Sequence, residues 1–352
     1  MKHGKKRKNI ITIIFIIIIL CSSGVLAYKI MNTPKIEKEY ENSLENTLSI
    51  EPIRVELEEE KINVYSGNDR PIAVMIDNNK KAQPQGGLNE AYIVYEIIAE
   101  GGESRLMAVF KGANVKKIGP IRSSRHYYLD YALENDAIYV HYGWSPQAQA
   151  DIQNLNVQNI NGIMESSKMF WRAKDKSAPH NVATTTEYIL SIAEKKGYET
   201  TSNAKSVLNY TSEEINLEEG TPATNIIIPY SESNKTNYVY DEDSKMYVRY
   251  SKGKKVKDWS TGEDVTTKNI IITIANNYPL QDGENKDRQN VENIGKLDGY
   301  YITNGRAIPI ICNKSSRAAK TRYEDINGNL IKVNDGRTFI NICPISANLV
   351  IE

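Results

Sequence analysis

Three arginines lie close together in this chain, in a segment that also contains carboxylates and glycine turns. Arg105 follows the run Glu100-Gly-Gly-Glu-Ser, and Arg122 and Arg125 enclose two serines after Gly119-Pro120. A guanidinium group carries five donors in a rigid fork that matches the oxygens of a carboxylate or a phosphate. Clustered arginines beside tight turns therefore indicate an anion site, and the sequence leaves the identity of the anion open.

The sharpest part of this signal is the pair Arg122 and Arg125 at the predicted start of a helix. Ser123 or Ser124 is a suitable N-cap, and the helix is expected to run to about Asn135. Unpaired backbone N–H groups and the helix dipole favour an anion at such a position. The alternative is an ordinary N-cap without a ligand. In that case the two arginines bind carboxylates of the protein itself, at Asp77, Glu96 or Glu100.

The segment around Gly101-Gly102 predicts a β-hairpin with charged side chains on one face. With the turn at these glycines, Ile98 lies opposite Arg105, and side chains alternate along each strand. Glu96, Glu100 and Arg105 are then expected to share a face. They form either an array that orients a ligand or a surface salt-bridge ladder worth about 0–1 kcal/mol. The two carboxylates are also candidates for acid–base catalysis.

Further polar residues at predicted strand ends are candidates for ligand contact. His141 ends one strand, Asp77 and Asn78 end another, and His180-Asn181 follow a proline. Histidine can bind metal or act as a base, but the spacing here is not that of a metal motif, so no metal and no cofactor are expected. The common hydrolase, nucleotide and zinc-protease motifs are absent. The hypothetical ligand site comprises Asp77, Asn78, Glu96, Glu100, Arg105, Arg122, Ser123, Arg125, His141, His180 and Asn181.

Residues 1–30 are predicted to anchor the protein in the cell membrane, with the folded part on the extracytoplasmic side. A basic start precedes an uncharged stretch from Ile10 to Tyr28, which is about the length of a short membrane span. The positive-inside rule sends the chain after Lys29 outward. A retained single N-terminal signal anchor is the favoured fate, and the alternatives are cleavage after Ala27 and lipid attachment at Cys21.

The charge balance argues against nucleic acid as a partner. Residues 1–30 contain six Lys or Arg and no acidic residue, which leaves 38 basic and 44 acidic residues in the remainder. Residues 31–66 contain nine Glu against four Lys or Arg and are interpreted as a flexible acidic spacer. A folded part so close to neutral lacks the broad basic surface of a nucleic-acid-binding protein.

The rest of the chain indicates an α+β protein with two domains. Residues 67–200 mix strand patterns with helix-start signals, whereas residues 223–352 are rich in Ile, Val, Tyr and Thr and contain good hairpin turns. We expect a mixed α/β domain, a linker over residues 201–222 and a mostly antiparallel β domain. Cys312 and Cys343 either pair in an oxidising compartment or lie as buried free thiols in neighbouring strands.

Several short motifs follow one another in a recognisable order. They are Arg70-Pro-Ile-Ala-Val-Met-Ile-Asp-Asn78, Ala82-Gln-Pro-Gln85, Gly87-Leu-Asn-Glu-Ala91, Glu100-Gly-Gly102, Gly119-Pro-Ile-Arg-Ser-Ser-Arg125, Ala178-Pro-His-Asn181 and Asp335-Gly-Arg-Thr338. Together the motifs resemble the YerB-like family of bacterial putative lipoproteins, whose domain has no assigned function. The resemblance implies a two-part extracytoplasmic protein tethered to the membrane, and it supplies no reaction or catalytic residue. The chain departs from the family at Leu20-Cys21, a poor lipid-attachment site, and at Cys312, where the family tends to have tryptophan.

These observations predict a membrane-anchored protein of the bacterial envelope that binds an anionic cell-wall component, phosphate- or carboxylate-bearing, through the arginine cluster. The main alternative is an enzyme, a hydrolase or transferase acting on an envelope polymer, with Glu96 or Glu100 as its acid–base group and the arginines stabilising negative charge. The third is a non-catalytic scaffold for another envelope protein, in which the arginine cluster is structural.

Overall fold

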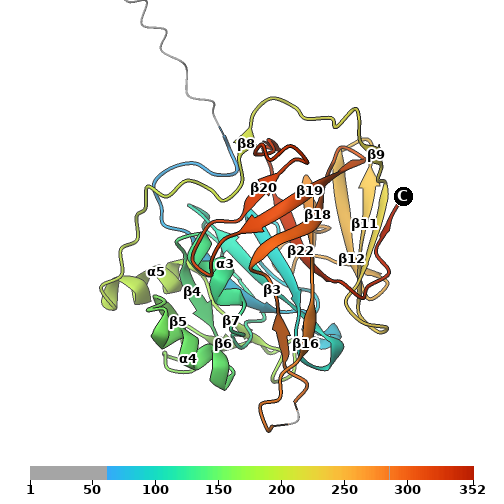
Figure 1. The fold of residues 1–352 in the computed structure, drawn as a ribbon. Helices are drawn as coiled ribbons and strands as arrows, with labels where there is room; N and C mark the ends of the chain where they lie inside the picture. The colour runs from blue at the N-terminus through green and yellow to red at the C-terminus, as the bar shows by residue number, and fades with distance from the viewer. Residues whose placement is uncertain (1–61, 285) are drawn as a thin grey trace, which may run out of the picture. The chain divides into compact units, whose positions relative to one another are not determined.

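A computed structural model of the protein describes residues 62–284 and 286–352 (Figure 1). The predictions for the membrane anchor, the lipid-attachment candidate Cys21 and the acidic spacer up to residue 61 lie outside the described residues. Within the described ranges, no helix is long and apolar enough to cross a membrane. These ranges combine a few short helices with extensive sheets, so the predicted α+β class is confirmed.

Short helices and many strands make up the described part of the chain. The helices are α3 (Tyr128–Glu134), α4 (Pro146–Asn154) and α5 (Thr186–Lys195), with the 3-10 turns η1 (Lys80–Ala82) and η2 (Glu100–Gly102). The large sheet runs in the order β20 (Arg322–Glu324), β19 (Arg306–Lys314), β18 (Gly295–Thr303), β15 (Asn269–Ala275), β22 (Thr338–Pro344), β2 (Ile93–Ile98), β3 (Ser104–Phe110), β1 (Ile72–Asp77), β4 (Ile138–His141) and β5 (Asn159–Asn161), with β9 (Thr221–Pro222) beside β19.

The remaining strands form a second sheet and three small pairs. The second sheet runs in the order β13 (Lys254–Lys255), β12 (Met246–Ser251), β11 (Lys235–Asp241), β10 (Asn225–Pro229) and β23 (Val350–Ile351), with β14 (Thr266–Thr267) beside β12. The pairs are β16 (Asn277–Pro279) with β17 (Gln289–Val291), β21 (Val333–Asn334) with β8 (Tyr210–Thr211), and β6 (Trp171–Arg172) with β7 (Val182–Ala183).

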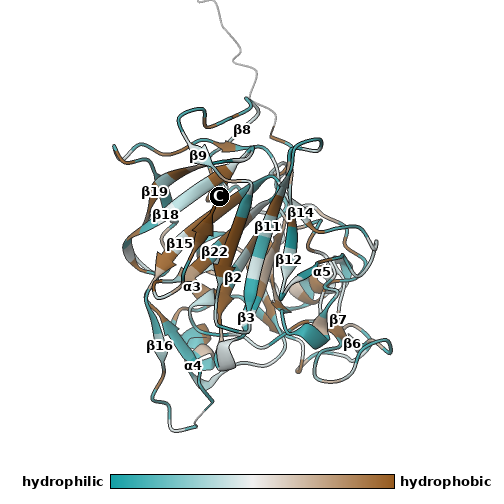
Figure 2. Cartoon of the chain, turned by 90° about the vertical axis from the view of Figure 1, so that its right-hand side faces the viewer, coloured by the Kyte–Doolittle hydropathy of each residue, from teal (hydrophilic) through white to brown (hydrophobic). Residues whose placement is uncertain are grey.

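The central strands of the large sheet are covered on both faces. Every residue of β1, β2, β3 and β22 is buried, so these strands lack the alternation of a half-exposed strand. Figure 2 shows β2, β22 and β15 as strongly hydrophobic strands. α3 packs on one face, where the rings of Tyr95 and Tyr131 lie 4.7 Å apart. The second sheet packs on the other face, where the rings of Tyr238 and Phe339 lie 5.8 Å apart.

Strands from both predicted domains share the large sheet. β22 comes from the C-terminal part of the chain, yet it lies between β15 and β2 and runs parallel to both. Two short strands, β8 and β9, fall within the predicted linker over residues 201–222. The sheet is therefore continuous across the proposed boundary, and the division into two domains stays a prediction.

The candidate disulfide between Cys312 and Cys343 is not formed, because both are buried free thiols. Cys312 lies on β19 and Cys343 on β22, and the strands β18 and β15 separate them. Strands are spaced about 4.8 Å apart, so three spacings place the cysteines about 14 Å apart, well beyond the roughly 7 Å limit for the Cα atoms of a disulfide. The two cysteines were also expected in neighbouring strands, and this prediction was wrong because two strands lie between them.

Cys312 and Cys343 are expected to resist alkylation in the folded protein. Burial raises the pKa of each thiol to about 12, and the thiolate is the reactive form. Iodoacetamide should label both residues only after unfolding in urea, without any reductant, as read by peptide mapping. A disulfide-linked peptide pair in the unreduced sample would contradict the separation of the two strands.

Candidate functional site

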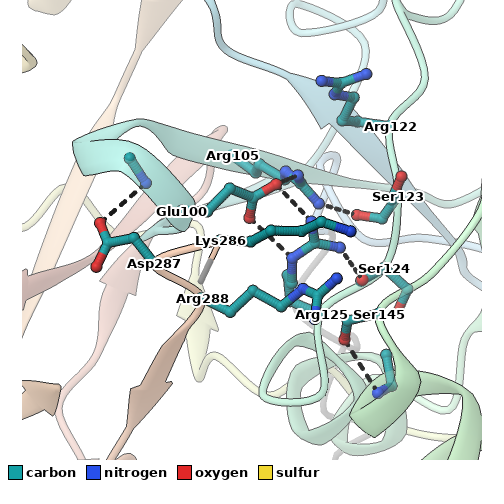
Figure 3. A network of polar contacts seen from close by, with 12 residues as sticks. Glu100, Arg105, Arg122, Ser123, Ser124, Arg125, Ser145, Lys286, Asp287 and Arg288 are labelled. Atoms are coloured by element: carbon teal, nitrogen blue, oxygen red, sulfur yellow. Dashed lines mark hydrogen bonds and ion pairs between the residues drawn. The ribbon is translucent and has the colours of Figure 1, made fainter. Parts of the chain in front are cut away.

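Two arginines of the cluster meet at one carboxylate. Arg105 on β3 donates through Nη2 to Glu100 Oε1 and through Nη1 to the Ser123 carbonyl. Arg125 donates from Nε to Glu100 Oε2 at 2.9 Å and through Nη2 to Glu100 Oε1, and its Nη1 lies 2.6 Å from the Ser124 carbonyl oxygen (Figure 3). Glu100 thus joins the turn after β2 to the segment that precedes α3.

The charge of Glu100 is set by this arrangement. Burial by itself raises the pKa of the carboxyl, but Arg105 and Arg125 outweigh burial and lower it to about 2. Burial and the nearby Arg105 lower the pKa of Arg125, against the opposing effect of Glu100. One carboxylate therefore pairs with two guanidinium groups, so the three side chains together carry a net charge of +1.

Arg122 belongs to a neighbouring set of charges. Its Nε lies 3.4 Å from Oδ2 of Asp77, which ends β1, and the same oxygen lies 2.7 Å from Nδ1 of His180. Asp77 is opposite Arg105 in the antiparallel pair of β1 and β3, so the two sets adjoin. The Arg122 side chain is 27% exposed, whereas that of Asp77 is buried.

A cleft of about 370 Å³ opens over the cluster. Two of its cations come from the segment between β16 and β17, far away in the sequence. Arg288 is paired with Asp282 and Glu284, and Asp287 accepts a hydrogen bond from the Gly101 N–H at 3.1 Å. The lining consists of Glu100, Arg105, Arg122, Ser123, Arg125, Lys286 and Arg288 (Figure 3). Lys286 and Arg288 were not among the predicted site residues, because no sequence pattern links a polar loop to residues more than 160 positions earlier.

The hairpin register differs by one residue from the predicted one. Ile97, not Ile98, lies opposite Arg105, because η2 places three residues in the turn and Ala99 N–H bonds the Glu103 carbonyl at 2.6 Å. A shift of one residue turns a side chain to the other face. Glu96 therefore lies on the face opposite Arg105, and the predicted shared face of Glu96, Glu100 and Arg105 was wrong.

Glu96 lies in the interior instead, where it binds the second sheet. Its Oε2 accepts a hydrogen bond from Nη2 of Arg249 on β12 at 2.9 Å, and neither side chain is exposed. Its Oε1 accepts hydrogen bonds from Asn78, Ser104 and Thr236 at 2.7–3.0 Å. Glu96 and Asn78 are thus interior hydrogen-bonding groups, and neither lines the cleft.

His141 and Asn181 are likewise held by protein groups and do not line the cleft. The ring nitrogens of His141 lie 2.8 Å from the Gly143 carbonyl and 3.1 Å from the Asn159 amide oxygen, and burial lowers its pKa. Asn181 accepts a hydrogen bond from Arg172 and donates to the carbonyls of Ala173 and Lys176.

The predicted helix start is also displaced. α3 begins at Tyr128, and neither Ser123 nor Ser124 is its N-cap. Instead, the Ser123 hydroxyl donates to the Tyr142 carbonyl and the Ser124 hydroxyl accepts from Tyr139. The helix dipole therefore does not favour an anion at these serines, and the positive charge comes from the arginine side chains. In the described ranges, no group of three or more His, Cys, Asp or Glu is placed to hold a metal ion.

Comparison with known proteins identifies the family. The description "Protein of unknown function (DUF3048) N-terminal domain" matches residues 58–199, and the corresponding "C-terminal domain" matches residues 226–340. The chain belongs to this family. It is 33% identical over 286 residues to "Putative lipoprotein YerB" of Bacillus subtilis, a match that covers 78% of this chain and 81% of the relative. The predicted YerB-like resemblance is confirmed.

A solved structure of the same relative supports the fold. The crystal structure of the YerB protein from Bacillus subtilis matches with a TM-score of 0.72 at 30% identity, over 80% of this chain and 94% of the other. The family description assigns no function.

Proposed function

We propose that the protein is a membrane-associated, extracytoplasmic binding protein for an anionic envelope component that bears phosphate or carboxylate groups. The observation that carries the proposal is the charge of the cleft: among the residues that the structure describes, five cationic side chains line it and Glu100 is the single carboxylate in that lining. The membrane location is supported by residues 1–30 and by the word "lipoprotein" in the name of the relative.

The cations are arranged so that an added anion would relieve repulsion. Arg105 lowers the pKa of Arg125 because two positive charges lie close together, and both depend on one carboxylate. Among the described ion pairs, Arg122 pairs with Asp77 alone. Lys286 pairs with Glu284, which is exposed. Forked guanidinium groups bind two oxygens of one phosphate or carboxylate at a time.

Inorganic phosphate or pyrophosphate is expected to raise the melting temperature of the full chain in detergent. A ligand that binds only the folded state adds about 2.7 kcal/mol to the free energy of unfolding at 100 times its Kd. Arg122→Ala should weaken binding at least about tenfold, since a charge-assisted hydrogen bond contributes roughly 1.5–3 kcal/mol. Differential scanning fluorimetry at a series of ligand concentrations gives the rise in melting temperature and the change in affinity.

The matched control for this variant is Arg322→Ala. Arg322 is also a partly exposed arginine paired with one carboxylate, Glu324, and it is not part of the cleft lining. It should leave the ligand-dependent shift unchanged. The proposal fails if no anion raises the melting temperature. In that case a low melting temperature of Arg122→Ala without ligand would favour the scaffold alternative, with a structural arginine cluster.

A hydrolase or transferase is the second candidate, and one contact favours it. His180 lies 2.7 Å from Asp77, whose carboxylate can orient the ring, and Asp77 adjoins Arg122 at the cleft. Glu96 is buried away from the cleft, and Glu100, with its low pKa, has no proton to donate near neutral pH. Turnover of a phosphate-bearing wall fragment that is lost in His180→Gln, with binding retained, would favour the enzyme.

A further inference from the structure

A second pocket, of about 290 Å³, has a chemistry different from that of the anion cleft. It lies between α4 and the segment after α5, at the ends of β4 and β5. Beside Ile152, Met164 and Lys196, the described lining contains two aromatic rings and four side-chain amides: Trp144, Tyr198, Gln149, Gln153, Asn159 and Asn161. An apolar ring surface combined with several amide groups suits a ligand that is apolar on one face and rich in hydroxyl groups at its edge.

The pocket and the anion cleft are next to each other. Gly143 separates them: a Cβ atom at this glycine would lie 3.3 Å from Oγ of Ser123 and 3.2 Å from Cδ1 of Ile163. Ser123 lines the anion cleft, and Trp144, the residue after Gly143, lines the pocket. Ile163 is 55% exposed, so an uncovered apolar side chain lies at this junction.

The two aromatic rings are fixed in position by the protein. The rings of Trp144 and His141 have centroids 5.5 Å apart, and the ring of Tyr139 lies 5.2 Å from His141 on the buried side. The Tyr198 hydroxyl donates to the Asn159 carbonyl at 3.2 Å. A binding surface held in this way loses little conformational entropy when a ligand binds.

Amide groups of the pocket have hydrogen-bonding capacity left. The Asn161 side-chain oxygen accepts from the N–H groups of Gly143 and Ile163, at 3.0 and 3.2 Å. Within residues 62–284 and 286–352, no hydrogen bond is recorded for the Asn161 side-chain nitrogen or for the amides of Gln149 and Gln153. These groups supply donors and acceptors, which is what sugar hydroxyl groups require.

We propose that this pocket binds a sugar ring, and that the ligand of the anion cleft is an anionic saccharide whose charged substituent lies against Arg122 and Arg125. The C–H face of the ring packs on Trp144, and its hydroxyl groups bind the amides. The proposal rests on the proposed function, because the charged substituent occupies the anion cleft described above. It specifies the ligand of the cleft as an anionic glycan.

Isothermal titration of the full chain in detergent with glucose 1-phosphate and with inorganic phosphate tests this proposal. We expect the sugar phosphate to bind about 2- to 12-fold more tightly, since aromatic packing contributes roughly 0.5–1.5 kcal/mol. Trp144→Ala should remove this preference and leave the affinity for inorganic phosphate unchanged. Trp171→Ala is the matched control, because Trp171 packs on Tyr188 and lies outside both linings.

The outcomes separate the two proposals. Equal affinity for both ligands in the wild type would overturn the saccharide pocket and keep the anion site. A preference that survives Trp144→Ala would also overturn the assignment of the sugar to this pocket. If neither compound binds, the proposed function itself fails, whatever the state of the pocket.

Discussion

Replacing Arg249 by methionine is expected to lower the free energy of unfolding by about 3–5 kcal/mol, since removal of one partner leaves the other charge buried without compensation. The pair Arg249–Glu96 is fully buried, with 2.9 Å between Nη2 and Oε2. It joins β12 of the second sheet to β2 of the large sheet. Urea unfolding monitored by circular dichroism measures the change.

A surface ion pair in the same sheet provides the control. Lys255 pairs with Asp264, and these side chains are 44% and 32% exposed. Lys255→Met should leave the urea midpoint unchanged, because the partly exposed Asp264 carboxylate that remains is solvated by water and still pairs with Lys257. If Arg249→Met unfolds at the wild-type midpoint, the buried pair contributes nothing to the contact between the sheets.

The sequence predicted the core strands and the arginine cluster but not the hairpin register. Apolar runs such as Ile72-Ala-Val-Met-Ile mark buried strands, and the two glycines mark the turn. Gly101 and Gly102 both have positive φ angles. Such angles occur in two-residue and in three-residue turns, so the two glycines do not decide how many residues the turn contains. That difference of one residue decided the environment of Glu96.

Long-range strand pairing was the second limit. Nothing in the local pattern indicates that β22 inserts between β15 and β2, because parallel neighbours can come from distant parts of a chain. The same pairing order separates Cys312 from Cys343. The cleft shows a similar limit, since Lys286 and Arg288 reach the arginine cluster through tertiary contacts alone. Local chemistry was predictable, whereas the assembly of distant segments was not.

Glu100→Gln is expected to destabilise the protein near neutral pH and to change how its stability depends on pH. Glu100 has a folded-state pKa of about 2, below the ordinary value of 4.5. A depressed pKa stabilises the fold at pH values above 4.5, and this contribution disappears as the pH falls toward 2. The shift corresponds to about 3 kcal/mol. Urea unfolding should show that the free energy of unfolding of the wild type falls between pH 7 and pH 3, and that the fall is smaller in Glu100→Gln.

The same variant distinguishes a closed structural cluster from an anion site. Without the carboxylate, Arg105 and Arg125 face each other with no counter-charge between them. If the cleft binds anions, phosphate should take over the role of Glu100, so it should raise the melting temperature of Glu100→Gln more than that of the wild type. A structural cluster closed to ligands predicts a destabilised variant that phosphate does not rescue. Because both results begin from the same loss of stability, the phosphate dependence alone decides between them.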